Sequence, residues 1–139
     1  MKAFLILFSL AVTTNLFAQN DTWKVSHNGK TKLEAKAESE ENVVTVKATD
    51  INKKGMLIVA FKEAAPQAAW QRQMMVFDPA ENELKNTKGA FIKLDNAAVK
   101  AAFKKSNTLM IYTMALPKDP RIAATVRVRR VHLCTLVLK

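Results

Sequence analysis

Apolar and polar residues alternate along most of the chain after residue 22, and this period of two indicates β-strands. The pattern is clear at 23–26, a Trp-Lys-Val-Ser stretch. The Asn28-Gly29 pair that follows accepts the positive φ angles of a tight hairpin turn. Alternation resumes at 30–37 with a charged outward face, which is typical of a solvated edge strand. The chain is therefore expected to begin its folded part with a hairpin.

Further strands are predicted along the chain, separated by turn signals. Two of them, 56–61 and 108–115, are apolar on both faces and are expected to lie inside a sheet. Residues 80–88 are polar and predict a loop or a weak edge hairpin. The remaining predicted strands are 43–48, 70–77, 90–94 and the longest run, 124–138.

One segment, 95–105, has the features of a helix. Asp95 or Asn96 can accept hydrogen bonds from its first amides. Its alanines favour the helical state, and Val99 and Phe103, four residues apart, form one apolar contact line. A single short helix is therefore expected.

Seven to eight strands and one short helix predict an all-β fold, a β-sandwich of the jelly-roll or immunoglobulin-like kind. A half-open barrel is the alternative. The strand-helix-strand passage at 90–115 also fits a βαβ crossover, although one such unit does not make an α/β protein.

The start of the chain is an apolar run at 3–16 behind a single charge, Lys2. This run is shorter than the roughly 20 residues that span a membrane and is typical of a secretory signal. We therefore expect a signal peptide at 1–18 and one domain at 19–139, periplasmic or secreted, with no transmembrane segment after cleavage. Lipid anchoring needs a cysteine at the cleavage site, where this chain has Gln19.

The charge of the chain is uneven. Residues 19–83 hold nine basic and ten acidic side chains, whereas 84–139 hold twelve basic and two acidic ones. A cationic half attracts anionic surfaces, so an anionic glycan, a lipid head group or a protein partner is the expected contact. Export makes nucleic acid the least suitable partner. The alternative is a solvated surface that only keeps the protein in solution.

The last predicted strand carries the densest candidate chemistry. Its apolar alternation continues only if one extra residue is inserted near 129–130, as a β-bulge does. With that bulge, Arg127, Arg129 or Arg130, His132 and Cys134 project from one face. Arginines on a strand face suit bidentate recognition of carboxylate, sulfate or phosphate. The alternative is a solvated sheet face paired with acids from neighbouring strands, among Glu34, Glu38 and Glu63.

His132 and Cys134 are two apart, so both side chains are expected to reach one point. The alternatives for this pair of residues are a nucleophile pair and a copper site assisted by methionines. A zinc site needs three or four ligands, and the only other imidazole is His27. The methionines lie within apolar runs that favour core packing. Cys134 is the only cysteine, so it is expected to be a buried hydrophobe, with an intermolecular bridge or a reactive thiol as alternatives.

Among the large aromatics, Trp70 is the best candidate for an exposed stacking platform. Trp23 shares a face with Val25 and is expected to point inward, and Tyr112 lies in a predicted interior strand. The chain has three glycines and neither a Gly-x-Ser-x-Gly motif nor a phosphate-binding loop. We therefore expect no enzymatic activity, no catalytic residues, no metal and no cofactor.

These observations predict an exported, non-enzymatic binding or interaction module. Its expected contact residues are Arg127, Arg129, Arg130, His132 and Trp70. One alternative is a subunit or inhibitor that pairs an open sheet edge with another chain. The other is a copper-site protein that uses His132 and Cys134.

Overall fold

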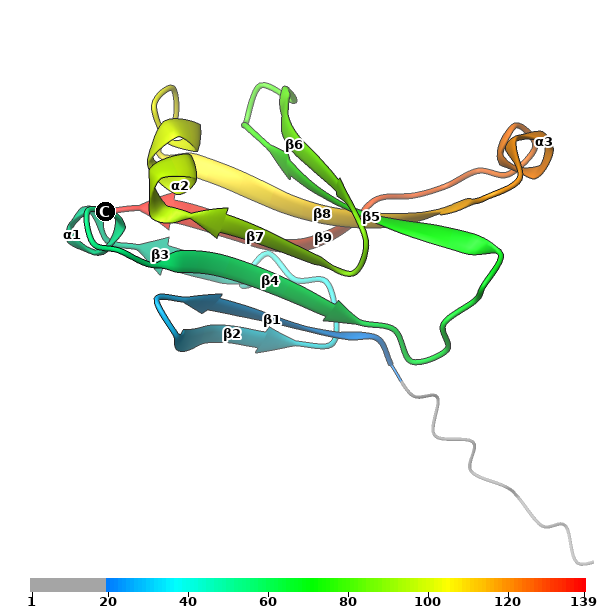
Figure 1. Cartoon of the computed structure of the whole chain (residues 1–139), viewed down its shortest axis with the longest axis horizontal. Coiled ribbons are helices and arrows are strands. Elements are labelled where there is room, and N and C mark those ends of the chain that lie inside the picture. The colour runs from blue at the N-terminus through cyan, green and yellow to red at the C-terminus, as the bar shows by residue number, and fades with distance from the viewer. Residues whose placement is uncertain (1–19) are drawn as a thin grey trace, which may run out of the picture.

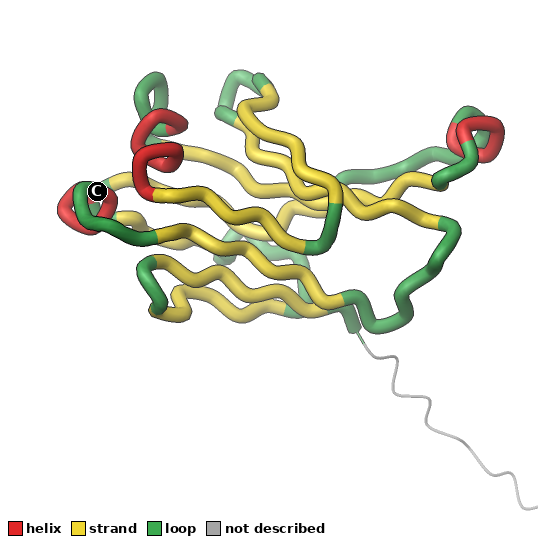
Figure 2. The backbone as a smooth tube through the Cα atoms, in the orientation of Figure 1, coloured by secondary structure: helices red, strands yellow, loops and turns green. Residues whose placement is uncertain are grey.

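The computed structural model describes residues 20–139. The predicted signal peptide at 1–18 lies outside these residues. The described chain forms two packed sheets, which confirms the predicted all-β sandwich (Figures 1 and 2). None of its helices is both long and apolar enough to cross a membrane.

The first sheet, sheet A, has the strand order β2-β1-β4-β7 and is antiparallel throughout. The second, sheet B, has the order β3-β9-β8-β5-β6, in which only β3 and β9 are parallel. Sheet A contains β1 (Thr22–His27), β2 (Lys30–Ala35), β4 (Met56–Lys62) and β7 (Phe91–Asp95). Sheet B contains β3 (Val43–Val46), β5 (Trp70–Phe77), β6 (Glu83–Lys88), β8 (Thr108–Pro117) and β9 (Val131–Leu138).

Three short helices complete the described chain, α1 (Ala48–Ile51), α2 (Asn96–Ala102) and α3 (Pro120–Ala123). Only α2 was expected, and Asp95 caps it by accepting a hydrogen bond from the Ala98 amide at 2.7 Å. The passage β7-α2-β8 runs from sheet A to sheet B, so it is not a βαβ crossover within one sheet.

The first hairpin and the edge or interior positions predicted for three strands are confirmed. Asn28 and Gly29 have φ angles of 50° and 79°, as the tight turn between β1 and β2 requires. β2 is an edge strand, whereas β4 and β8 lie between neighbours on both sides. Residues 83–88, one of the two options considered for the polar segment, form the edge strand β6.

The core lies between the sheets and holds both apolar faces together. Trp23 points inward as expected, stacks on Phe61 with ring centroids 6.0 Å apart, and donates a 2.8 Å hydrogen bond from Nε1 to the carbonyl of Leu133. This bond connects sheet A to sheet B, and it satisfies the one polar atom of the indole.

One end of the sandwich, the closed end, is filled by a buried polar network. His27 Nε2 contacts Asn96 Oδ1 at 2.8 Å, and the Asn96 amide donates to Asn28 Oδ1 and to the carbonyls of Asp50 and Lys53. His27 and Asn96 are 2% and 4% exposed. The network ties the β1–β2 turn to α1 and to the start of α2.

The expectation of a continuous strand at 124–138 is wrong. Pro120 at the first helical position and the side chain of Asp119, which caps the Arg121 amide, start α3. Strand pairing begins only at Val131, and the extra residue is Leu133, because His132 pairs with Tyr112 and Cys134 with the adjacent Ile111. The bulge is therefore not near 129–130, and it turns His132 and Cys134 to opposite faces.

Candidate functional site

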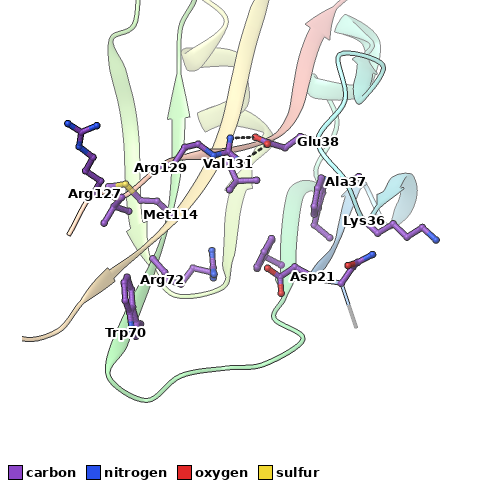
Figure 3. Close-up of a pocket in the computed structure, with 15 residues that line it drawn as sticks. Asp21, Lys36, Ala37, Glu38, Trp70, Arg72, Met114, Arg127, Arg129 and Val131 are labelled. Atoms are coloured by element: carbon purple, nitrogen blue, oxygen red, sulfur yellow. Dashed lines mark hydrogen bonds and ion pairs between the residues drawn. The ribbon is translucent and has the colours of Figure 1, made fainter. Parts of the chain in front are cut away.

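The opposite end of the sandwich, the open end, contains a cleft of about 510 Å³ that we call the arginine cleft (Figure 3). One side is formed by β5, β8 and the segment at 127–131, and the other by the chain at 36–38 and by Asp21. Its charged lining consists of four basic and two acidic side chains: Lys36, Arg72, Arg127, Arg129, Asp21 and Glu38. The cleft therefore carries an excess of positive charge.

The base of the cleft is Arg72, which β5 turns toward sheet A. Its guanidinium lies over the Phe61 ring, 4.2 Å from the centroid, and Phe61 in turn stacks on Trp23. Nε forms an ion pair with Glu63, and Nη1 donates to Thr113 Oγ1 at 3.0 Å. Only 14% of the Arg72 side chain is exposed. This arginine is consequently held in one orientation.

The rim of the cleft is bridged by a bidentate ion pair. Arg129 donates to both carboxylate oxygens of Glu38, at 3.1 and 2.8 Å. Glu38 also accepts a 2.7 Å hydrogen bond from the backbone amide of His132. The Arg129 hydrogen bond is the main reason that the pKa of Glu38 lies below its ordinary value.

Two further predicted residues line the same cleft. Arg127 is exposed, and within residues 20–139 it has no ion-pair partner. Trp70 is half-buried at the start of β5 and faces the cleft from the same strand as Arg72 (Figure 3). The structure therefore brings together Arg127, Arg129 and Trp70, three of the five expected contact residues, in one cleft.

The other two predicted residues, Arg130 and His132, lie on the outer face of sheet B. The Arg130 guanidinium stacks on Tyr112 and Phe77, 4.3 and 4.7 Å from the ring centroids, and pairs with Glu81. The His132 ring packs against the edge of Tyr112 and contacts Thr135 Oγ1 at 3.0 Å. Burial lowers the pKa of His132. The expectation that His132 shares a face with Arg127 is therefore wrong, and of the two arginines considered at the bulge it is Arg129, not Arg130, that lines the cleft with Arg127.

Cys134 lies in the hydrophobic core, as its preferred interpretation as a buried hydrophobe predicted. Burial raises the pKa of its thiol to about 12, so the reactive thiolate is strongly disfavoured. The expectation that Cys134 and His132 reach one point is wrong, since the bulge at Leu133 separates their faces. Within residues 20–139 no three His, Cys, Asp or Glu side chains form a cluster with metal-binding geometry.

Sequence reasoning missed Arg72, which is the most constrained cation of the cleft. A signal was present, because Arg72 alternates with Met74 and Val76, whose side chains point into the core. A charged residue on the inward face of a strand needs a partner, and Glu63 and Phe61 supply it from elsewhere in the fold.

Comparison of the chain with family models, with curated proteins and with solved structures gave no match. A proposal of function therefore rests on the cleft geometry. Guanidinium groups at its base and rim, together with an aromatic wall, are chemically suited to hold an anionic ligand.

Proposed function

We propose that this protein is an exported, non-enzymatic binding module whose arginine cleft holds an acidic saccharide, a sugar chain that carries carboxylate or sulfate groups. One observation carries the proposal. Three arginines from two segments of the chain, Arg72 on β5 and Arg127 and Arg129 before β9, line one cleft together with Trp70.

The three arginines offer different kinds of contact. Arg72 is oriented by Phe61, Glu63 and Thr113, and within residues 20–139 its Nη2 atom has no hydrogen-bond partner. A preoriented donor loses little conformational entropy on binding. Arg127 has no ion pair to break among the described residues, so it is available to a ligand anion without an internal competitor.

Arg129 is the adjustable member of the set. Its pair with Glu38 is exposed, with 72% of the arginine side chain and 34% of the glutamate side chain accessible. Exposed pairs contribute about 0–1 kcal/mol, so a ligand carboxylate or sulfate can replace Glu38 at small cost.

Trp70 favours a saccharide over a simple anion. A half-buried indole next to cationic side chains presents an apolar ring face on which a sugar ring can stack. The volume of about 510 Å³ falls within the range of pockets that hold small organic ligands. The apolar run at 3–16 supports export, where acidic glycans are accessible.

The test is calorimetric titration of the mature chain, residues 19–139, with a tetramer of galacturonate. Neutral maltotetraose is the control ligand. Arg127→Glu combined with Arg129→Glu is expected to weaken tetramer binding at least about a hundredfold, roughly tenfold for each charge reversed. Trp70→Ala is expected to weaken it about tenfold. Raising the salt concentration weakens binding as well, because the attraction is screened over about 8 Å at physiological ionic strength.

The matched control is two charge reversals outside the cleft, Arg121→Glu combined with Lys118→Glu. Arg121 lies on α3 with 91% of its side chain exposed, and Lys118 is exposed just before α3. This variant has the same net charge as the cleft variant and should bind like the wild type. Equal loss in both variants, or equal binding of the neutral tetramer, contradicts a specific cleft. Binding only to vesicles of phosphatidylglycerol contradicts the saccharide assignment.

A further inference from the structure

A second hollow lies on the side of the sandwich where β6 and β7 end the two sheets. It is a groove of about 410 Å³ between α2 and β6, which we call the lysine-rimmed groove. In Figure 1 α2 and β6 stand on the same side of the molecule. The apolar lining consists of Val76, Leu84, Leu94, Ala98, Ala101 and Ala102. Leu84 is 44% exposed, so part of this apolar surface faces water.

Three lysines border this apolar surface, namely Lys85 on β6 and Lys104 and Lys105 after α2. The one acidic lining residue, Asp78, is already engaged by Asn82, whose backbone and side-chain nitrogens both donate to it at 2.9 Å. The groove therefore has unbalanced positive charge around an apolar floor, a combination that complements an occupant with acidic and apolar groups.

The strand beside the groove has a free hydrogen-bonding edge. β6 pairs with β5 on one side only, and no described strand lies on its other side. The Gly89 amide donates to the Arg72 carbonyl. Hydrogen-bonded positions on an antiparallel strand recur at every second residue, so Thr87 and Lys85 also bond to β5. The backbone groups of Asn86 and Lys88 consequently point to the free edge.

A free edge of this kind adds a further strand readily, and β6 contains no proline that would prevent it. A second copy of this chain is a poor occupant. It would bring the same three lysines against each other, from halves of the chain that each carry twelve basic and two acidic residues.

We propose that β6 and the lysine-rimmed groove bind an extended acidic segment of a protein partner. The segment lies antiparallel or parallel to β6 as a sixth strand of sheet B and bonds to the backbone of Asn86 and Lys88. On the face of the segment that points toward the groove, apolar side chains enter it and carboxylates contact Lys85, Lys104 and Lys105. This site is separate from the arginine cleft and does not depend on the saccharide proposal.

The probe is a fluorescein-labelled eight-residue peptide in which valine and glutamate take turns at every second position, with threonine between them, so that both point toward the groove. It is acetylated and amidated at its ends. The affinity is measured by the fluorescence anisotropy of the labelled peptide as the mature chain is added. The decisive variant is Asn86→Pro, which removes an outward amide that does not bond to β5. It is expected to weaken binding at least about tenfold. Asn86→Ala keeps that amide and is the matched control, expected to bind within about twofold of the wild type.

A second variant tests the charge complementarity. Lys104→Glu combined with Lys105→Glu is expected to reduce affinity at least about tenfold, and the same peptide with lysine in place of glutamate is expected not to bind. The arginine-cleft variant should retain wild-type affinity for the peptide. If Asn86→Pro does not fold, amide chemical shifts of the wild type at 84–88 and 104–105 provide the same test, because strand addition must perturb them.

Four outcomes overturn the proposal. They are equal binding of Asn86→Pro and Asn86→Ala, equal binding of acidic and basic peptides, no saturable binding up to about 1 mM protein, and unperturbed amides at 84–88. Self-association of the chain that Asn86→Pro abolishes would also overturn it, since the occupant would then be a second copy.

Discussion

The two ends of the sandwich handle polar groups in opposite ways. At the closed end, His27 and Asn96 are buried and their hydrogen bonds are made within the protein. At the open end, Arg127 and Arg129 are exposed around a cleft, and the pair between Arg129 and Glu38 is accessible to solvent. A buried network that is fully satisfied specifies one structure, whereas exposed charges around a hollow remain available to a ligand. Mutations should therefore reduce stability at the closed end and binding at the open end.

The largest effect on folding is expected at Gly55. A Cβ atom there would lie 1.8 Å from Asn28 Oδ1 and 3.0 Å from Asn96 Nδ2, so the network must move to admit it. Gly55→Ala should lower the free energy of unfolding by about 3 kcal/mol. Gly29→Ala has open space but a φ of 79°, and should cost only about 1 kcal/mol. Urea denaturation measures both, and a smaller loss for Gly55→Ala than for Gly29→Ala would contradict this account.

Asn96→Ala removes the hub of the same network. It leaves His27 without its partner and deprives the carbonyls of Asp50 and Lys53 of a donor, at a buried position. The expected loss is about 2 kcal/mol in the free energy of unfolding. Asn107→Ala, at an exposed asparagine, is the control and should change it by less than about 0.5 kcal/mol. Equal stability of the two variants would show that the network contributes little.

At the open end, Arg72 is the one cation expected to matter for folding as well as for the cleft. Arg72→Met keeps an apolar stem against Phe61 but leaves Glu63 without its cation and removes one of the hydrogen bonds of Thr113. A loss of about 1 kcal/mol is expected, since the pair is partly exposed. Arg121→Met, at a side chain that is 91% exposed, should be neutral in the same denaturation experiment. A neutral Arg72→Met would show that the contacts of Arg72, like the exposed pair between Arg129 and Glu38, contribute little to the stability of the fold.

The smallest expected effect is on pH dependence at the rim. The pKa of Glu38 lies below the ordinary value of 4.5, chiefly because of Arg129, so the pair stabilises the fold above that value. The contribution is lost as the pH falls through the lowered pKa. Carbon NMR of the Glu38 carboxyl should show a midpoint below 4.5, and Arg129→Ala should raise it. A midpoint at or above 4.5 in the wild type would mean that the pair does not persist in solution.

Most of the fold was predictable because its strands carry local patterns. Alternation located β1 and β2, and the continuous apolar runs located β4 and β8 and identified them as interior strands. The prediction of a continuous strand at 124–138 was wrong for a physical reason. Valines and arginines alternate at 126–129 as they would in a strand, but strand formation also needs a partner, and pairing with β8 begins only at Val131. The position of the bulge depends on that pairing and not on local sequence.

The site was predictable only in part. The charge imbalance and the arginine-rich segment indicated Arg127 and Arg129, and the turn before β5 indicated Trp70. Arg72 joins them through Phe61 of the other sheet. Contacts between sheets leave no period in the sequence, so neither the cleft nor the lysine-rimmed groove follows from alternation.

The most direct test of the central claim is an amide chemical-shift map of the mature chain titrated with the galacturonate tetramer. The account predicts saturable shifts at 36–38, 70–72 and 127–131, with no shifts at the closed end around Asn28, Gly55 and Asn96. Shifts confined to other surfaces, or no shifts at saturating tetramer, would contradict the assignment of the arginine cleft as the ligand site.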